Sequence, residues 1–378
     1  MSWPNRILWL FLIVGAFAIG WLARGLAQPA PDPALTLIGR AGQIISEEYY
    51  GEVPAPRQLA YAAIRGMLSE LGDKYATFFE PTAAAREGLG ANGHDAVIGM
   101  RGEVRDGKFV VIDVTPDGPA AQGGLHIGDV IQTIDGWTIP PSSTSAEIHA
   151  MIRGSVGSTA HLTVQRSQNV LSLDMQRMPF QEVTTQHFGE VAYLRFDRFT
   201  IQTPQQVKQA LSQVLTQTTK GLILDLRYNG GGLMNSAQQI LDLFLDQGIA
   251  FYASTKNGDL LPYPTKTDGD ISEAIPLVVL IGPNTYSAPE TVAAAIADRG
   301  RGKLIGERTH GKGSINTTAN LGDGSAIRFT VAHWLTPVQQ RMFEGIGVPP
   351  DIVVQDNSDT TQDTVLQYAI DYLQHMHP

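Results

Sequence analysis

The fold is decided by a buried strand that runs into a glycine turn. Residues 224–232 of this stretch read LDLRYNGGG. Glycine permits a tight turn and a close backbone approach, so amide N–H groups of the turn can face a substrate, although a plain turn explains the same residues. Strand and helix patterns alternate around it, which predicts an α/β layer with crossover helices and functional loops at the strand ends. The expected strands are 191–196, 221–226, 277–281 and 303–305, and the expected helices are 204–216, 233–245 and 291–298.

Composition limits the possible classes of function. The chain has 378 residues, 43% hydrophobic and 17% charged, which is enough for two or three modules with buried cores. Its formal net charge of -10 argues against nucleic acid as a partner, because nucleic-acid affinity comes largely from neutralising phosphates. The absence of cysteine excludes disulfides, cysteine-ligated metals and a thiol nucleophile.

An apolar stretch near the N-terminus predicts engagement with a membrane. Residues 7–23 contain no charge and lie between Arg6 and Arg24. As a helix they reach about 26 Å, which is marginal for a hydrocarbon core of about 30 Å. Residues 1–27 fit a membrane-spanning signal anchor, which we expect, or a secretory signal peptide. Either places the remainder outside the cytoplasm, in the cell envelope (periplasm) as a single-pass membrane protein or as a secreted form, after a proline-rich linker over 28–34.

Two further regions precede the α/β part. Residues 35–90 have helical periodicity, and residues 91–180 change to short strands broken by glycine turns. The stretch 124–136, GLHIGDVIQTIDG, resembles the signature of PDZ domains. In such a domain a glycine turn exposes backbone N–H groups that hold a free C-terminal carboxylate, and an adjacent strand edge pairs with the peptide. Ile98, Gly99 and Met100 occupy the place of that substrate-binding loop.

Two short motifs in the α/β part supply candidate catalytic groups. The stretch 284–290, NTYSAPE, places Ser287 at the start of a predicted helix, where serine is usually only a cap but where negative charge on a substrate oxygen is also favoured. The stretch 311–314, GKGS, places Lys312 between glycines. A lysine in such a turn is usually solvated. To act as a base it must be neutral, and burial is what can lower its pKa from about 10.4 toward about 7.

Taken in order, these motifs resemble those of the C-terminal processing peptidases, also called tail-specific or carboxy-terminal serine proteases. The shared motifs are DLR-x-N-x-GG, S-A-x-E, G-E-x-T-x-G-K-G and DGSA, and the similarity covers nearly everything from residue 35 onward. The resemblance implies an α/β crotonase-like (ClpP-like) protease core over 181–378, ending in a C-terminal helix. It further implies an inserted PDZ-type β-rich domain, an N-terminal helical segment and, with the apolar stretch, a membrane-spanning N-terminal helix.

The same resemblance assigns the catalytic roles. The serine of S-A-x-E is the family's nucleophile and the lysine of GKG is its base, which correspond here to Ser287 and Lys312, 25 residues later. The family's oxyanion hole uses backbone N–H groups that correspond to Gly230 or Gly231 and to Ala288. Neither a metal nor a cofactor is implied.

Three other positions bear on the catalytic assignment. Asn316 stands where the family usually has a glutamine that orients the lysine, and it is one methylene shorter. His310 precedes the GKG motif and is an alternative base, but no acid that would orient it is evident. Arg153 matches an arginine that helps to couple the PDZ domain to the catalytic site in the family, and a plain surface role explains it equally well.

We therefore expect a serine endopeptidase that captures exposed, apolar C-termini through its PDZ domain and cleaves extracytoplasmic proteins. The alternative is a catalytically silent PDZ adaptor or scaffold that binds protein tails. A third hypothesis is an enzyme that works only after an activating signal. The expected partners are protein or peptide substrates and, through the N-terminal stretch, a membrane. The sequence leaves open a homo-oligomer and an activating partner.

Overall fold

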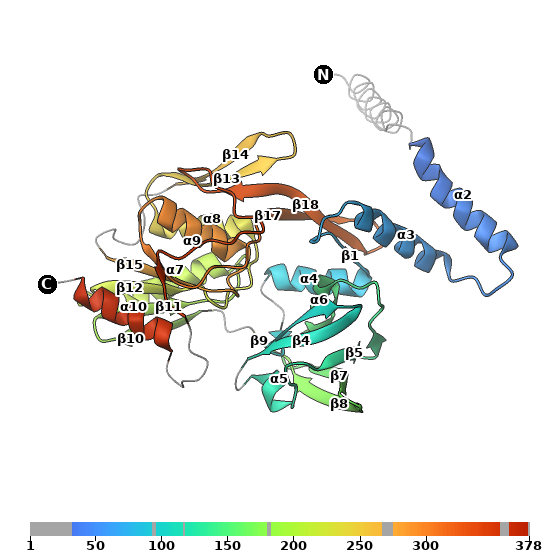
Figure 1. The fold of residues 1–378 in the computed structure, drawn as a ribbon, viewed down its shortest axis with the longest axis horizontal. Coiled ribbons are helices and arrows are strands. Elements are labelled where there is room, and N and C mark those ends of the chain that lie inside the picture. Colours follow the sequence, from blue (N-terminus) through green and yellow to red (C-terminus); the bar gives the residue numbers. More distant parts are fainter. Residues whose placement is uncertain are drawn as a thin grey trace, which may run out of the picture. The chain divides into compact units, whose positions relative to one another are not determined.

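The structure is a computed structural model, and it describes residues 32–92, 96–115, 118–179, 183–266, 275–355 and 363–376. The chain falls into two compact units, residues 1–67 and residues 68–378. Figure 1 colours the elements along the chain.

The predicted fold class requires a correction at the N-terminus. The stretch 7–23, on which a membrane-spanning helix was predicted, lies outside the described residues. Within the described ranges no helix is sufficiently long and apolar to cross a bilayer. The longest of them, α2 (Pro33–Glu48), has 16 residues, whereas a spanning helix needs about 20 apolar ones. The fold-class prediction, which counted a membrane-spanning helix among the elements, is wrong on this point.

The first unit contains α2 and most of α3 (Pro56–Glu70). The Asp32 side chain caps α2 by accepting a hydrogen bond of 2.8 Å from the N–H of Ala34, and Pro33 occupies the first turn. None of the residues of α2 is buried. The predicted helical region 35–90 thus holds these two helices and, in the second unit, the strand β1 (Thr77–Phe79) and α4 (Pro81–Asn92).

The α/β part is built on a six-stranded sheet in which β12 (Gly221–Asp225) is the strand predicted before the glycine turn. All five residues of β12 are buried, as expected for a parallel strand covered on both faces. Five of its strands are parallel to one another, and the sixth, β10, is antiparallel at one edge. In spatial order the sheet comprises β10 (Thr184–Phe188), β11 (Val191–Arg195), β12, β15 (Leu277–Ile281), β16 (Lys303–Gly306) and β19 (Ile352–Val353).

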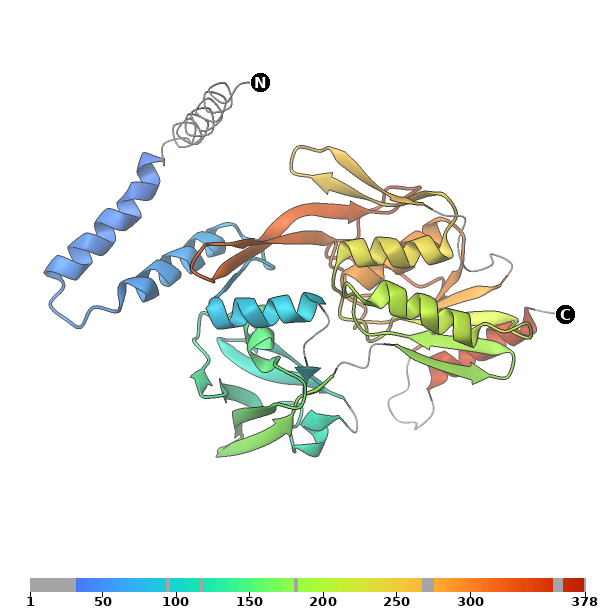
Figure 2. The same ribbon diagram turned by 180° about the vertical axis from the view of Figure 1, so that it is seen from behind.

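Helices cover both faces of this sheet (Figures 1 and 2). Alternate side chains of β12 pack against different helix layers, because successive side chains of a strand point to opposite faces of the sheet. Leu222 and Leu224 pack in the cluster that includes the helices α7 (Thr203–Val214), α8 (Met234–Phe244) and α9 (Ala288–Asp298). Ile223 packs on the opposite face with α10 (Thr364–His375).

A second, antiparallel sheet carries the segment that follows the GKG motif. Its strands run in the order β1, β18 (Ala326–Leu335), β13 (Gly248–Thr255) and β14 (Leu260–Thr265), and β17 (Ser314–Asn320) also pairs with β18. The long strand β18 pairs with β1 near its start and with β13 near its end. Trp334 near the end of β18 is fully buried in the α/β core.

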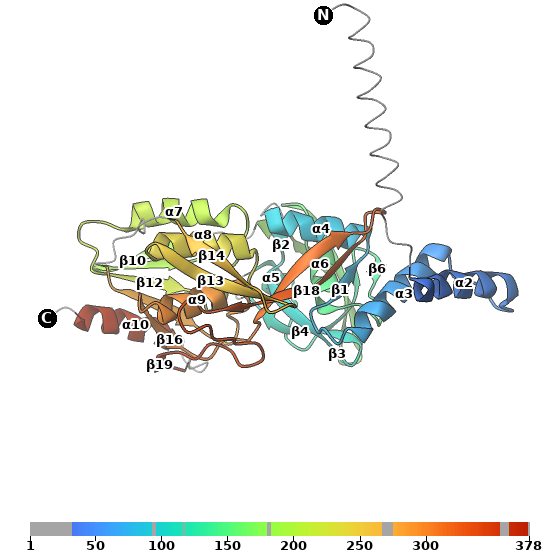
Figure 3. The same cartoon turned by 90° about the horizontal axis from the view of Figure 1, so that it is seen from above.

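The β-rich region forms its own sheet and its own core. The strand order is β3 (Met100–Arg105), β4 (Lys108–Val114), β5 (Val130–Ile134), β7 (Thr159–Arg166) and β8 (Asn169–Gln176), with β6 (Trp137–Thr138) paired to β5. The helices α5 (Pro119–Gln122) and α6 (Ser145–Ile152) belong to the same region, and β2 (Ala96–Val97) pairs with β9 (Met178–Pro179) where the chain enters and leaves it. Figure 3 shows this region from above.

Candidate active site

Ser287 lies on a sharp turn between β15 and α9. Its backbone angles, φ 72° and ψ -117°, fall in a region that residues other than glycine rarely adopt. The N–H of Ser287 donates to Oε2 of Glu290 at 2.7 Å, and the N–H of Tyr286 donates to the carbonyl of Asn229 at 3.1 Å. Such a strained residue persists only where its surroundings hold it, and strained residues cluster at functional sites. Ser287 is 9% exposed, at the N-terminal end of α9.

The carboxylate of Glu290 joins the serine turn to the lysine loop. Glu290 is fully buried. Its Oε2 accepts from the N–H groups of Ser287 and Lys312 at 2.7 and 2.8 Å. Its Oε1 accepts from the N–H of Gly311 at 2.7 Å and from the hydroxyl of Thr309 at 2.5 Å. One carboxylate oxygen therefore contacts the backbones of both residues that the sequence proposes as nucleophile and base.

Lys312 is partly buried and lies against aromatic rings. Its Nζ is 4.6 Å from the ring centroid of Tyr75 and 5.2 Å from that of Tyr286. Its carbonyl accepts a hydrogen bond of 3.0 Å from the indole of Trp334. Burial lowers the pKa of Lys312 to about 8, and the nearby guanidinium of Arg328 lowers it further, against the opposing effect of surrounding carboxylates. A substantial fraction of this lysine is therefore neutral near pH 8.

The two glycines beside Lys312 are required by close packing. A Cβ on Gly311, whose φ is +93°, would lie 2.8 Å from the N of Gly347. A Cβ on Gly313 would lie 2.8 Å from the N of Glu344. The N–H of Gly313 also donates to Oε2 of Glu344 at 2.9 Å. The segment around residues 344–347 thus fixes the path of the lysine loop.

The glycine turn after β12 lies directly against the serine. A Cβ on Gly231 would lie 3.1 Å from the Cβ and 3.6 Å from the Oγ of Ser287, and 2.7 Å from the carbonyl of Tyr286. In this structure the N–H of Gly231 donates to Oδ1 of the buried Asn229 at 3.0 Å. The N–H of Gly230 donates to the carbonyl of Asp197 at 3.2 Å. Both predicted donors therefore already have protein acceptors.

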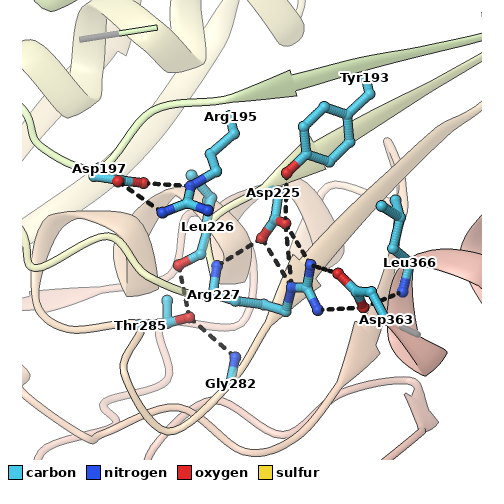
Figure 4. Close-up of polar contacts among 10 residues, drawn as sticks. All are labelled: Tyr193, Arg195, Asp197, Asp225, Leu226, Arg227, Gly282, Thr285, Asp363 and Leu366. Carbon is cyan, nitrogen blue, oxygen red and sulfur yellow. Dashed lines mark hydrogen bonds and ion pairs between the residues drawn. The ribbon is translucent and has the colours of Figure 1, made fainter. Parts of the chain in front are cut away.

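An ionic network, buried except at Asp363, anchors the strand end before this turn (Figure 4). The guanidinium of Arg227 contacts both oxygens of Asp225, with a shortest distance of 2.7 Å, and donates two hydrogen bonds of 2.8 and 2.7 Å to Asp363. Asp363 also caps α10 by accepting from the N–H of Leu366 at 2.9 Å. The hydroxyl of Tyr193 donates to Asp225 at 2.9 Å. Bidentate pairs of this kind fix geometry as well as charge, so the network ties the C-terminal helix to the strand that carries the glycine turn.

Comparisons with known proteins find similarity along most of the chain. The family model for peptidase family S41 matches residues 190–354, and that for the PDZ domain matches residues 96–176. A carboxy-terminal-processing protease of Bartonella bacilliformis is 31% identical over 92% of this chain and 82% of its own length. The chloroplastic C-terminal processing peptidase of Tetradesmus obliquus is 32% identical over 82% of this chain and 71% of its own. Among solved structures, a photosystem II D1 C-terminal processing protease superposes with a TM-score of 0.65 at 28% identity, covering 89% of this chain and 97% of that one.

The chain belongs to peptidase family S41. It is a protease of the C-terminal processing group that carries a PDZ domain, and its fold is the S41 protease fold with that domain. The resemblance inferred from the sequence motifs is confirmed.

In this S41 protease, the predicted tail-binding residues lie at the start of β3. Ile98 is fully buried, and its carbonyl accepts from the N–H of Ala120 at 2.7 Å. Gly99 has φ +75°, and its carbonyl accepts from the N–H of Thr115 at 2.9 Å. Met100 begins β3 and is partly buried. The side chain of Ile98 belongs to the PDZ core, so only the backbone of this loop is suited to contact a carboxylate.

Arg153 is the C-cap residue of α6 and forms an ion pair with Glu87 of α4. Glu87 also pairs with Arg328 of β18 at 2.9 Å. Since Arg328 lowers the pKa of Lys312, one acidic residue links the PDZ helix to the surroundings of the candidate base. A purely surface role for Arg153 does not describe this contact.

The other two predicted residues are not joined to Lys312 by a direct hydrogen bond within the described part of the chain. Asn316 on β17 donates from Nδ2 to the Thr330 hydroxyl at 3.2 Å, and its buried Oδ1 has no hydrogen-bond partner among the described residues. The ring of His310 lies 4.6 Å from that of Tyr286, and burial lowers the pKa of this histidine. The orienting role of Asn316 stays a prediction.

The sequence reasoning missed three parts of the site. The sequence position of Glu290 at a helix end indicates only a favourable charge, although the serine-to-glutamate spacing of a capping box was present as a signal. Tyr75, which lies against Lys312, and Asp363, which pairs with Arg227, are far from the motifs in sequence. No local pattern distinguishes them from ordinary surface residues.

Proposed function

We propose that this chain is a serine endopeptidase in which Ser287 is the nucleophile and Lys312 the general base. The observation that carries the proposal is the shared contact of Glu290 with the backbones of both residues. The lowered pKa of Lys312, about 8, supports it, because only a neutral amine can accept the hydroxyl proton. Exposed protein C-termini bind the PDZ domain, and the substrates are extracytoplasmic proteins, in keeping with the bacterial and chloroplast sources of the relatives.

The proposed reaction proceeds by acyl transfer. The Oγ of Ser287 attacks the carbonyl carbon of the scissile peptide bond while its proton passes to Nζ of Lys312. Backbone N–H groups of Ala288 and of the turn at Gly230 and Gly231 stabilise the oxyanion, the latter after exchanging their present acceptors. The ammonium of Lys312 then gives its proton to the leaving amine. Water hydrolyses the acyl-serine, with the lysine again accepting and returning the proton.

The proposed domain arrangement keeps the boundaries that were predicted from the sequence. A PDZ domain over 91–180 is inserted between the helical region 35–90 and a peptidase core over 181–378. The cores support the boundary between the PDZ domain and the peptidase core, because their buried clusters are separate, whereas the PDZ cluster also includes Phe79 and Ala83 of the helical region. Arg153 has a regulatory role in this scheme through its pairing with Glu87.

The occupied N–H groups of Gly230 and Gly231 favour a second candidate, in which the protein binds tails but is silent, or cleaves only after a signal. A cleavage assay separates these readings. An unstructured protein with a free, apolar C-terminus is incubated with the chain, and product ends are mapped by mass spectrometry beside a substrate whose C-terminus is amidated. We expect cleavage of the free-tailed substrate, slower cleavage of the amidated one and none with Ser287→Ala. Cleavage that survives Ser287→Ala refutes the proposal, and binding without cleavage supports the silent adaptor. Cleavage that starts only when a tail peptide is added supports activation.

A further inference from the structure

The edge of the PDZ sheet that would pair with a peptide is β3. Within the described residues its only strand neighbour is β4, so its other side is open to a further strand. The helix α6 packs against β3. An edge strand presents unpaired N–H and C=O groups, which an extended peptide uses when it binds by strand addition.

Two side chains of α6 occupy backbone donors of this edge. The N–H of Gly102 donates to Nε2 of His149 at 3.3 Å. The N–H of Val104 donates to Oγ of Ser145 at 2.9 Å. Gly102 and Val104 are two residues apart, which is the spacing at which a strand directs successive N–H groups to one side. The donors that a bound peptide needs are therefore taken by the protein itself.

The state of His149 is set by its second hydrogen bond. Its Nδ1 lies 2.7 Å from the carbonyl of Ser145. A carbonyl oxygen only accepts, so Nδ1 carries the proton and Nε2 is left as an acceptor. The ring packs edge-on against Phe109, with the centroids 5.2 Å apart, and burial lowers the pKa of His149 to about 4. At neutral pH the imidazole is uncharged and holds the Gly102 N–H.

Two hydrogen bonds hold α6 against the edge of β3. On the core face of the strand, a Cβ on Gly102 would lie 2.6 Å from Cζ of Phe109, so β3 is closely packed there as well. A peptide that pairs with this edge must therefore replace the bonds between α6 and β3.

We propose that His149 and Ser145 hold the tail-binding edge of β3 closed, and that a C-terminal tail binds by exchange. Carbonyl groups of the tail take the N–H groups of Gly102 and Val104, which strips both side chains of their donors. A buried acceptor left without a donor is costly, so the tail binds best when one of its own side chains donates a hydrogen bond to Nε2 of His149. The preferred tail carries a hydroxyl or amide side chain on the face toward α6. This inference rests on tail recognition in the proposed function and refines the expectation of a purely apolar tail.

Fluorescence anisotropy with labelled ten-residue peptides tests the exchange. The full chain carries Ser287→Ala so that bound tails are not cut. One peptide ends in a run of alanines, and five others carry serine at one of the last five positions in turn. We expect serine at one of these positions to tighten binding about tenfold over the alanine tail, the effect of one satisfied buried acceptor.

His149→Phe keeps the packing against Phe109 but removes the acceptor. Because the free edge then has an unsatisfied Gly102 N–H, the alanine tail should bind about fivefold to tenfold more tightly, and the advantage of serine should vanish. Ser145→Ala should tighten binding in the same direction. His161→Phe is the matched control, because His161 is a solvent-exposed histidine that pairs with Asp174 on the neighbouring strand β8, and it should change nothing.

Hydrogen exchange of the Gly102 and Val104 amides gives a readout that does not depend on tail affinity. Both should be protected without a tail, and Ser145→Ala should release Val104 selectively. The inference is overturned if tails bind but neither α6 variant changes affinity, or if these amides are unprotected in the free protein. A chain that binds no tail, yet cleaves in a Ser287-dependent manner, refutes tail recognition in the proposed function as well.

Discussion

Lys312 owes its suitability as a base to burial and to a balance of neighbouring charges. Burial lowers its pKa to about 8, and Arg328 acts in the same direction. Glu344, Asp73 and Glu290 act in the opposite direction, since each favours the ammonium. The balance leaves a lysine that can lose its proton at moderately alkaline pH and can return it during the reaction.

This balance predicts the pH dependence of cleavage. A lysine base works only when neutral, so kcat/KM should fall as the pH decreases through about 8, the pKa of Lys312. Arg328→Gln removes a nearby positive charge and should raise this pKa, moving the midpoint upward by roughly 0.5 to 1 unit. A pH series of initial rates measures both. A midpoint below the ordinary pKa of histidine that does not move in Arg328→Gln would instead implicate His310, whose pKa is lowered by burial.

Glu290 should be indispensable because it accepts from four donors in a fully buried position. Glu290→Gln converts one oxygen into a donor group that faces N–H groups. We expect the free energy of unfolding to fall by about 2 to 4 kcal/mol and kcat to fall by about 10²-fold or more. Chemical denaturation and cleavage rates measure these effects. Glu190→Gln, in a surface pair with Lys220, is the matched control, and an equally small effect of Glu290→Gln would contradict this role.

At the scale of residues, the sequence could identify the candidate nucleophile and base but not the residues that hold them in position. The motifs around Ser287 and Lys312 are local, so they can be recognised in a single chain. The contacts of Glu290 with Gly311 and Lys312 join segments about twenty residues apart, and they exist only once β16 and the lysine loop have folded against α9. The rules for charges at helix ends indicate only that an acidic residue is favourable at the position of Glu290, and they say nothing about its contacts with the lysine loop.

At the scale of elements, the α/β alternation was predictable because each buried strand is a continuous apolar run. β12 and β15 were both placed within a residue of their observed ends. The hairpins β13–β14 and β17–β18 were not predicted. β18 is only partly buried along most of its length, so its sequence lacks a clear alternation of apolar and polar residues. Its pairing with β1 depends on a distant part of the chain.

The ionic link between α10 and β12 predicts that two substitutions of Asp363 lower the free energy of unfolding by different amounts. Asp363→Asn keeps a good N-cap for α10 but loses the charge that faces Arg227. Because the Asp363 carboxylate is 37% exposed and Arg227 retains Asp225, we expect a loss of about 1 kcal/mol of unfolding free energy.

Asp363→Ala removes the cap as well and should cost about 1 kcal/mol more. Thermal and denaturant unfolding of the two variants measure the difference. Equal stabilities for Asn and Ala would mean that the cap contributes nothing, and a wild-type stability for both would contradict the anchoring of α10 by this residue.

At the scale of the whole molecule, Glu87 joins the PDZ region to the second sheet. Burial raises its pKa, but the guanidiniums of Arg153 and Arg328 hold the pKa below its ordinary value, so Glu87 stays charged. Its negative charge partly offsets that of Arg328 beside the lysine. The PDZ domain and the candidate base therefore share one electrostatic link.

Glu87→Gln should change both the pKa of Lys312 and the stability of the protein. The positive charge of Arg328 would act on Lys312 without compensation, so the pKa of the lysine should fall and the midpoint of the pH profile should move downward. This is opposite to the shift expected for Arg328→Gln. The variant should also be less stable by about 1 to 2 kcal/mol, because two partly buried guanidiniums lose a partner. An upward shift, or none, would contradict the link.

The order of modules along the chain was accessible to sequence reasoning, whereas the contacts between them were not. The PDZ signature and the protease motifs each lie within one continuous stretch. The closure of β3 by α6 and the pairing of Glu87 with two arginines arise only from tertiary packing. The prediction of a membrane-spanning helix was wrong because it took the hydropathy of residues 7–23 alone as evidence for an element of the fold. Those residues lie outside the described structure.

The most direct test of the account is the capture of an acyl-enzyme. A peptide nitrophenyl ester is mixed rapidly with the chain, and the modified residue is located by mass spectrometry while the burst of nitrophenol is timed. The account predicts a single acyl group on Ser287, formed at a rate that rises through about pH 8 and falls about 10²-fold or more in Lys312→Met. An acyl group on another residue, or a burst that Lys312→Met leaves unchanged, would contradict it.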